Sequence, residues 1–364
     1  MSTTNYAVAP GAYLEEWLED EGLSQGQAAA MLGYSRKQVN EIVNGRAPIT
    51  PDAATRLGRV TPIPAESWLL HEAKYRSDRA RILDEERLAE HAGEIHANAA
   101  AYLREIGFTQ ATKRSPGNLV SDFLAFHRFG TWEAYQESHE VETTGEWALA
   151  ALKESKSLVD QTLLTTWLRA GEMTEAFELG QTCTYDSEKL ESMLPELRER
   201  AARPDDTLLK DLNSMLLQAG VIYLMVKPPQ RFPLYGVTRW INGRIPVIQQ
   251  TGRRCGDGFV IWTFFHEIGH LLHDPRGELH LEFQKESQRN SAAEKRANAF
   301  AFETLFGDEG LAPFKGLTYS SQIARVAKQV GVSPGTAVHQ LHRKRLLHYT
   351  YCNDLTVNLE GTFS

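Results

Sequence analysis

The sequence predicts a mainly α-helical protein that carries one small β-sheet. Two observations lead to this fold class. Apolar residues recur at helical spacing through most of the 364 residues, between Gly, Ser and Pro residues that mark helix ends. The period changes near position 220, where short β-branched and aromatic runs flank the pair Asn242 and Gly243. We therefore expect helices, then a small sheet, then further helices that pack against it.

Composition and charge narrow the class of protein. With 42% hydrophobic and 24% charged residues, the chain can bury a core and should form two or three domains. It holds no apolar run of about 18 residues, and its opening MSTTNYAVAP lacks the features of a secretion signal. We therefore expect a cytoplasmic protein with no membrane partner. The three cysteines, Cys183, Cys255 and Cys352, are odd in number and far apart, which indicates free thiols.

Residues 1–72 are predicted to form a compact unit of five helices. The helical patterns are AYLEEWLEDEG, SQGQAAAML, SRKQVNEIVNG, TPDAATRLGRV and PIPAESWLLHE. Ser24, Ser35 and Thr50 stand where the second, third and fourth patterns begin, and their side chains can cap a helix. The sequence therefore predicts helix starts at these three positions.

The second and third of these patterns have the layout of a helix-turn-helix. Gly33 falls in the turn, and Val39 and Ile42 fall on one face of the second helix, which we expect to be buried. The other face would offer side chains that can reach bases or phosphates. These are Ser35, Arg36, Lys37, Gln38 and Asn40, with Arg46 just beyond the helix.

The charge of this unit leaves two interpretations open. The net charge of the whole chain is −8, so DNA binding would need a local basic surface. Residues 1–60 contain five Lys and Arg against seven Asp and Glu, a net charge of −2. Because that electrostatic footprint is weak, the unit is interpreted either as a DNA-binding domain or as a module for dimerisation or partner docking.

Residues 73–204 are predicted to form a helical connector and a helical middle region. The charged stretch up to position 115 keeps apolar residues at helical spacing. Beyond it, the aromatic residues Phe123, Phe126, Trp132, Trp147 and Trp167 are the expected anchors of a helical core. Nothing in this part of the sequence indicates chemistry.

Residues 205–312 are predicted to form an α+β domain, and residues 313–364 a helical tail. GVIYLMVKPP predicts a strand, and GVTRWINGRIPVIQQ predicts a hairpin. The helix FVIWTFFHEIGHLLHD follows, then a polar loop from 274 to 290 and the helix SAAEKRANAFAFETLF. We expect the hairpin either to form an exposed sheet edge beside the first helix, able to hold a peptide as an added strand, or only to cover that helix.

The helix with the sequence HEIGH carries the strongest functional signal. His266 and His270 are four residues apart, which places both imidazoles on one helical face, where they can share a tetrahedral ion. Glu267 is placed to take a proton from a metal-bound water. Glu294, on the next helix and 24 residues after His270, can supply a third ligand. Asn298, one turn further, can accept the second N–H of a ligating imidazole.

The alternative is an ordinary core helix, since this helix is apolar enough to be one. Burial of Glu267 and two imidazoles without an ion or partners would cost several kcal/mol, which favours a metal site with one zinc ion per chain. We expect His273 and His280 to lie outside the ligand set. For the group that stabilises an oxyanion, the sequence leaves Tyr235, Arg239 and His280 as alternatives.

These segments also resemble known families. Residues 12–70 resemble the Cro/C1-type (XRE) helix-turn-helix, in particular the HigA-like antitoxin form, through SRKQVNEIVNGRAPIT and PAESWL. Residues 205–310 resemble the ImmA/IrrE zinc metallopeptidases, through GVTRWINGRIPVIQQTGRRCGDGFVIWTFFHEIGHLLH and EKRANAFAFETL. VSPGTAVHQLHRKRLL is similar to the closing segment of proteins that fuse the two modules. The chain departs from the peptidase pattern at Arg296, where an acidic residue is common, and at LFGDEG.

The resemblance implies a gluzincin-like fold in which His266, His270 and Glu294 bind zinc and Glu267 activates water. Such peptidases cut one regulatory protein, typically a repressor with its own helix-turn-helix, in response to stress or the induction of a mobile element. The implied partners are a double-stranded DNA operator, a repressor-type protein substrate, a cognate toxin and a second copy of the chain.

Three functions remain open at this point. The first is a zinc-dependent, site-selective endopeptidase whose N-terminal domain brings it to DNA or to a DNA-bound substrate. The second is an antitoxin-like repressor of its own operon, whose metal domain is structural or sensory. The third is a protein-binding module in which both domains dock partners.

Overall fold

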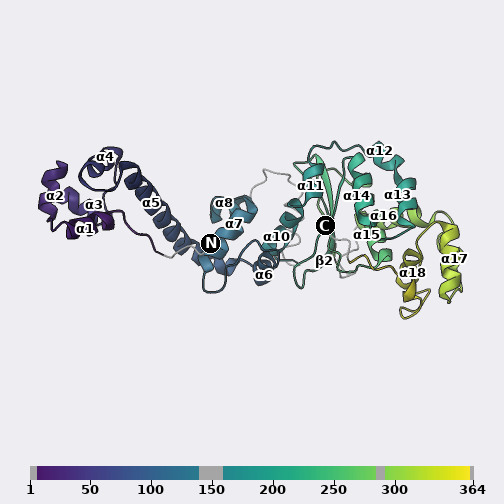
Figure 1. The fold of residues 1–364 in the computed structure, drawn as a ribbon. Helices are drawn as coiled ribbons and strands as arrows, with labels where there is room; N and C mark the ends of the chain where they lie inside the picture. The colour runs from purple at the N-terminus through teal and green to yellow at the C-terminus, as the bar shows by residue number, and fades with distance from the viewer. Residues whose placement is uncertain (1–5, 139–158, 284–291, 361–364) are drawn as a thin grey trace. The chain divides into compact units, whose positions relative to one another are not determined.

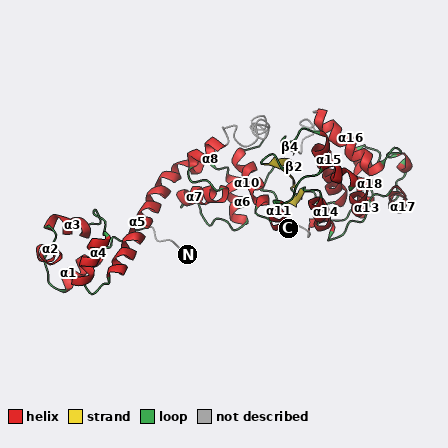
Figure 2. Ribbon diagram, turned by 90° about the horizontal axis from the view of Figure 1, so that it is seen from above, coloured by secondary structure: helices red, strands yellow, loops and turns green. Residues whose placement is uncertain are grey.

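The computed structural model describes residues 6–138, 159–283 and 292–360. They are mainly helical and contain one four-stranded sheet, which confirms the predicted fold class (Figures 1 and 2). The chain divides into two compact units, residues 1–93 with 111–122, and residues 94–110 with 123–364. The domain boundaries expected at positions 72, 204 and 312 stay predictions.

The first unit begins with five helices, as its capping residues predict. The helices are α1 (Gly11–Asp20), α2 (Gln25–Leu32), α3 (Arg36–Val43), α4 (Pro51–Val60) and α5 (Ala65–Leu88). Ser24 and Ser35 begin α2 and α3 with capping boxes. In each box the serine side chain accepts a hydrogen bond from the backbone N–H three residues further on, and the side chain of the glutamine at that position accepts one from the backbone N–H of the serine. Gly33 ends α2 at φ 69°, a left-handed conformation that glycine adopts without strain. Sequence signals within a few residues therefore set the turn between α2 and α3.

The core of this unit lies between α1, α3, α4 and the start of α5. Val39 and Ile42 of α3 are buried, as expected, and pack in one cluster with Leu14, Leu57 and Trp68. Helix α5 continues through position 72 without a break. The opposite face of α3 is left exposed to solvent.

A series of helices leads from the first unit to the sheet. They are α6 (Ala97–Glu105), α7 (Pro116–His127), α8 (Trp132–Ser138), α10 (Gln161–Glu172), α11 (Glu175–Gly180), α12 (Ser187–Ser192), α13 (Leu194–Ala201) and α14 (Leu208–Gln218). The anchors Phe123, Phe126, Trp132 and Trp167 are all almost fully buried, and Trp147 lies outside the described residues. The indole N–H of Trp167 also donates to the carbonyl oxygen of Val226 at 3.2 Å, which fixes α10 to the chain just after the first strand.

The sheet contains β1 (Ile222–Met225), β2 (Leu234–Ile241), β3 (Ile245–Gln250) and β4 (His280–Phe283), in the order β1-β3-β2-β4. Strand β1 is parallel to β3, while β2 is antiparallel to both β3 and β4. Asn242 and Gly243 turn the predicted hairpin with φ angles of 51° and 63°. Because β2 and β3 both lie inside the sheet, the expectation that this hairpin forms an exposed edge is wrong. The edges are β1 and β4.

The polar loop expected from 274 to 290 is wrong over the residues of strand β4. Residues 280–283 form a strand in which His280 and Leu281 are paired with Thr238 and Val237 of β2. The rest of the expected loop, from 284, lies outside the described residues. The stretch LHLEF at 279–283 alternates apolar and polar residues, which is the period of a strand, and pairing with β2 completes it.

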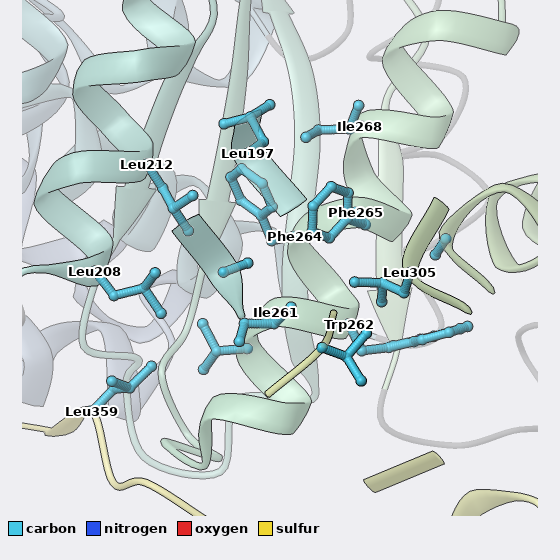
Figure 3. Packing of buried hydrophobic residues seen from close by; sticks show 14 of the residues in the cluster. Leu197, Leu208, Leu212, Ile261, Trp262, Phe264, Phe265, Ile268, Leu305 and Leu359 are labelled. Carbon is cyan, nitrogen blue, oxygen red and sulfur yellow. The ribbon is translucent and has the colours of Figure 1, made fainter. Parts of the chain in front are cut away.

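Helix α15 (Asp257–His273) is the central helix of the second unit. It contacts the sheet, α16 (Ala292–Phe306) and α18 (Pro334–Arg343), and nearly all of its residues are buried. Figure 3 shows Phe264 and Phe265 of α15 close to Leu197 of α13 and Leu305 of α16. Burial on all sides explains why the sequence of α15 is apolar on all sides.

A buried carboxylate joins the start of α15 to α18. Asp257 is fully buried and accepts hydrogen bonds from Ser333 Oγ at 2.6 Å and from the backbone N–H of Val357 at 2.9 Å. Ser333 is also the N-cap of α18, which follows α17 (Ser320–Val330). The carboxyl group of Asp257 therefore fixes both α18 and the last described segment of the chain.

Two expectations concern the whole chain. Cys183, Cys255 and Cys352 are all free thiols, as their number and spacing predict. Among the described helices, none combines the length and the apolar character that a membrane span requires.

Candidate metal centre

Two helices bring the three predicted ligands together. His266 and His270 lie on α15, and Glu294 lies on α16, which packs closely against it. The Nε2 atoms of the two imidazoles are 3.1 Å apart. Glu294 Oε2 is 3.4 Å from His266 Nε2, and Glu294 Oε1 is 3.4 Å from His270 Nε2. All three residues are buried, so these atoms converge away from bulk water.

The triangle of donor atoms fits a tetrahedral cation. Two ligand atoms that each lie about 2.0–2.1 Å from a zinc ion stand roughly 3.3–3.4 Å apart at the tetrahedral angle. The separation of the two imidazole nitrogens is 3.1 Å, and each imidazole lies 3.4 Å from a different oxygen of Glu294, all close to that value. Two imidazoles and one glutamate also form a donor set that is common in catalytic zinc sites. Because one donor atom from each residue lies within 4.8 Å of the other two, the described residues form a group that can hold such an ion.

Asp274 orients His270. Its Oδ2 lies 2.7 Å from His270 Nδ1, and its Oδ1 accepts from Arg296 Nη2 at 2.5 Å. A hydrogen bond from Nδ1 to this carboxylate leaves the lone pair of Nε2 directed at Glu294 and His266. Arg296, which departs from the resembled pattern, therefore supports the residue that positions a predicted ligand.

The role expected for Asn298 is wrong. Its Nδ2 donates to the backbone oxygen of Glu294 at 2.7 Å, and its Oδ1 accepts from Arg343 at 2.7 Å. Both groups of its amide are therefore used away from the imidazoles, although Asn298 lies one helical turn after Glu294. Asp274, at the end of α15, takes the place that the sequence assigned to Asn298.

Glu267 is buried between α15 and β2. Its Oε2 accepts a hydrogen bond from Thr238 Oγ1 at 2.5 Å, while its Oε1 has no hydrogen-bond partner among the described residues. An ideal Cβ built on Gly236 of β2 would stand 3.0 Å from Oε1, so a glycine here leaves room for the carboxyl group. Burial raises the pKa of Glu267 to about 7, and the bond from Thr238 opposes this rise. The carboxyl group is thus suited to both accepting and donating a proton near neutral pH.

The charges around His270 favour a bound cation. Burial alone would lower the pKa of His270, but hydrogen bonds to Asp274 and Glu294 raise it to about 10. Burial would likewise raise the pKa of Asp274, while its bonds with His270 and Arg296 lower it to about 2. These carboxylates stabilise positive charge between them, either a proton on His270 or a metal ion that displaces it.

Strand β4 adds two further side chains to the centre. The ring of His280 stacks on that of His270, with centroids 4.0 Å apart, and its Nε2 lies 3.6 Å from Asp274 Oδ2. Glu282 Oε2 lies 3.7 Å from His266 Nε2. Burial and the neighbouring His270 lower the pKa of His280 to about 4. The sequence did not point to Glu282 because β4 itself was not predicted.

The other side chains considered from the sequence lie further from the three ligands. Arg239 Nη1 is paired with Glu172 at 2.7 Å, so its guanidinium is held against α10. The ring of Tyr235 packs edge-on against Phe259. The ring of His273 contacts Phe300 of α16. Of the groups proposed for an oxyanion, only His280 borders the ligands.

The polar side chains expected on α3 are exposed, as is Arg46 after the helix. Ser35 and Gln38 bond to each other in the capping box, and Asn40 Nδ2 donates to Gln25 Oε1 at 3.2 Å. These three side chains therefore have a structural role in the helix pair. Arg36 and Lys37 remain directed to solvent, and Lys37 Nζ lies 3.9 Å from a carboxylate oxygen of Glu41.

Comparison with known proteins identifies the two parts of the chain. Residues 14–68 match the family model described as helix-turn-helix, and residues 260–342 match that of the IrrE N-terminal-like domain, a peptidase family. The second match runs from α15 to α18 and contains all three predicted ligands. The protein is therefore one that joins an XRE-type helix-turn-helix domain to a C-terminal peptidase domain of the ImmA/IrrE kind. Both resemblances inferred from the sequence are confirmed.

Two individual proteins resemble a part of the chain. The virulence-associated protein I of Dichelobacter nodosus is 41% identical over 70 residues, which are 19% of this chain and 65% of that protein. The chain thus spans about two thirds of that relative's length. A solved addiction module antidote protein of the HigA family from Coxiella burnetii is 28% identical, over 23% of this chain and 92% of its own, with a TM-score of 0.21. That score is too low for structural conclusions.

Proposed function

We propose that the protein is a zinc-dependent, site-selective endopeptidase that cleaves a regulatory protein of the repressor type. The observation that carries this proposal is the triangle of His266, His270 and Glu294 with the buried carboxyl group of Glu267 beside it. The match to the IrrE N-terminal-like peptidase domain supports the same class of reaction. The N-terminal domain would bring the enzyme to DNA or to a DNA-bound substrate.

In this mechanism each side chain has a separate task. His266, His270 and Glu294 hold one zinc ion, which supplies a Lewis acid for a peptide carbonyl and lowers the pKa of water. Glu267 Oε1 takes a proton from the attacking water and returns it to the nitrogen of the leaving amine. The hydrogen bond from Thr238 to Oε2 keeps Oε1 in position for both transfers.

Strand β4 offers a place for the substrate chain. It is an edge strand that pairs with β2 on one side, and it carries His280 and Glu282 next to the ligands. A peptide can add to such an edge as a further strand, through backbone hydrogen bonds. A substrate bound there would pass directly beside His266 and His270.

The test combines metal content with cleavage of a panel of helix-turn-helix repressors. The expected result is cleavage at one site by the wild type, lost on chelation and restored by zinc. Glu267→Gln should retain zinc and lose cleavage, because the amide cannot accept the proton. Glu303→Gln, on the exposed side of α16, is the matched control and should cleave normally. Cleavage by Glu267→Gln at the wild-type rate would overturn the proposal.

A second function is favoured by the exposed face of α3 and the helix-turn-helix match. In it the chain is an antitoxin-like repressor that binds a double-stranded operator as a homodimer, with a cognate toxin as a further partner and the metal domain structural or sensory. Arg36 and Lys37 are then the side chains free to reach DNA.

Operator binding by the full chain tests this function. The expected result is retention of a DNA fragment that carries the operator, weakened by Arg36→Ala and unaffected by chelators. Lys74→Ala on α5 is the matched control. Equal binding by the wild type and Arg36→Ala would contradict the role given to α3.

A further inference from the structure

A charged pocket opens next to the metal centre. It has a volume of about 590 Å³, and its walls include three arginines, Arg254, Arg343 and Arg345, together with Trp262 and Tyr349. The arginines come from the loop between β3 and α15, the end of α18 and the turn after α18. Three segments distant in the sequence therefore bring positive charge to one cavity.

Two residues of the pocket wall adjoin the predicted ligands. Glu282 lines it, and Glu282 Oε2 is 3.7 Å from His266 Nε2. Trp262 also lines it and precedes His266 by one helical turn, about 5–6 Å along α15. A peptide positioned at the ligands can therefore place a nearby side chain in this pocket.

Aromatic rings hold two of the arginines in place. The guanidinium of Arg343 lies 4.4 Å from the ring centre of Trp262, and Arg343 also donates to Asn298. The guanidinium of Arg254 lies 5.2 Å from the ring centre of Tyr235 and 5.4 Å from that of Phe259. Stacking restricts these side chains and reduces the entropy that they lose when an anion binds.

The electrostatic potential inside the pocket is positive. His339 forms part of its wall, and burial, followed by Arg343 and Arg254, lowers the pKa of this imidazole to about 3. The wall also includes one carboxylate, that of Glu282, against the three arginines. The positive side chains outnumber it, so the pocket attracts an anionic group.

We propose that this pocket is a specificity subsite that binds an acidic side chain of the substrate, Asp or Glu, within a few residues of the cleaved bond. The proposal rests on the peptidase function proposed above and adds a substrate class to it. A guanidinium can bind a carboxylate through two parallel hydrogen bonds, which is the geometry that favours Arg over Lys at such a site. The adjoining ligands favour a peptide over a nucleic acid as the occupant.

The experiment measures binding, so that it does not depend on cleavage. Two fluorescein-labelled peptides of equal length, one of alternating Glu and Ala and one of alternating Gln and Ala, are titrated with the full-length Glu267→Gln protein. We expect the acidic peptide to bind about tenfold more tightly than the neutral one. The double variant Arg254→Gln and Arg345→Gln should lose most of this preference, because each exposed ion pair contributes a factor of roughly two to five. Arg325→Gln, on the exposed face of α17, should keep it.

A charge-reversal variant distinguishes the loss of the subsite from a failure to fold. Arg254→Glu with Arg345→Glu should favour a Lys and Ala peptide over the acidic one, a gain that misfolding cannot produce. Equal binding of both peptides by the parent protein, or tighter binding of a single-stranded oligonucleotide than of the acidic peptide, would overturn the proposal.

Cleavage is followed separately in a library of peptides. If cleavage occurs without enrichment of acidic residues, the peptidase function stands and the subsite proposal fails. If the acidic preference in binding is present without cleavage, the subsite stands and the peptidase function fails.

Discussion

The Nδ1 atom of His270 lies 2.7 Å from Oδ2 of Asp274, the residue that ends the same helix. This contact orients the imidazole of His270, a predicted ligand, through its Nδ1 atom. Arg296 donates a hydrogen bond to the other carboxylate oxygen of Asp274. Hydrogen bonds of this type determine which imidazole nitrogen is free for a metal. Asp274 and Arg296 therefore belong to the centre beside His266, His270 and Glu294, and the HEIGH pattern shows only part of it.

Asp274→Asn should weaken zinc binding about 10- to 100-fold, because the amide is a poorer acceptor for the N–H of His270. The measurement is competition with a fluorescent chelator. Asn298→Ala is the control, since Asn298 bonds to Glu294 and Arg343 and not to an imidazole. Affinity lost in Asn298→Ala and retained in Asp274→Asn would restore the assignment expected from the sequence.

Thr238→Val should lower the rate of cleavage about tenfold and leave zinc content unchanged. The variant removes the hydrogen bond that positions Glu267 but touches no ligand. The rate is measured under single-turnover conditions beside elemental analysis. Thr251→Val, which removes another buried threonine hydroxyl from the same sheet region, should retain activity. A fall in zinc content in Thr238→Val would show that the threonine supports the ligands instead.

The stability of the protein should fall in acid through His339. Its pKa in the folded protein is about 3, because burial and the nearby Arg343 and Arg254 disfavour the charged form. An unfolded histidine has a pKa of about 6.5, so between these values the unfolded chain binds a proton that the folded protein does not. Stability is therefore complete above about pH 6.5 and is lost as the pH falls below it.

His339→Leu removes this dependence. From about pH 7 to about pH 5, the free energy of unfolding of the wild type should fall by about 2 kcal/mol more than that of the variant. Denaturant titrations at the two pH values measure the difference. The same acid sensitivity in both proteins would show that His339 is protonated in the folded protein.

Gly335→Ala should lower the free energy of unfolding by about 1–3 kcal/mol. A Cβ at this position would overlap Oδ1 of Asp257 and push α18 away from the start of α15. Gly130→Ala is the control, because a Cβ there meets nothing within 4 Å. Thermal unfolding of both variants beside the wild type measures the effect. Equal stability of Gly335→Ala and wild type would show that α18 is not held by this contact.

The elements of the fold that depend on short sequence patterns could be predicted from the sequence. Capping residues located α2 and α3, and the glycine between them marked the turn. The hairpin followed from Asn242 and Gly243, and α15 and α16 from their length and apolar pattern. The three ligands share faces of two helices, so spacing alone was enough to bring them together.

The pairing of strands that are distant in the sequence could not be predicted in the same way. Strand β4 has an alternating pattern, LHLEF, but the pattern does not show which strand β4 pairs with, and its pairing with β2 is what places the hairpin inside the sheet. His280 and Glu282 reach the centre only through that pairing. Asn298 was expected to bond to an imidazole because it lies one turn from Glu294, but periodicity does not show which way a side chain turns.

Metal content tests the central claim most directly. Elemental analysis of the dialysed wild-type protein should find about one zinc ion per chain. His266→Ala and Glu294→Ala should each lose it, while Glu267→Gln should keep it, because Glu267 is placed to act on water and not on the ion. A wild type without metal, or a Glu294→Ala variant that holds as much zinc as the wild type, would contradict the account.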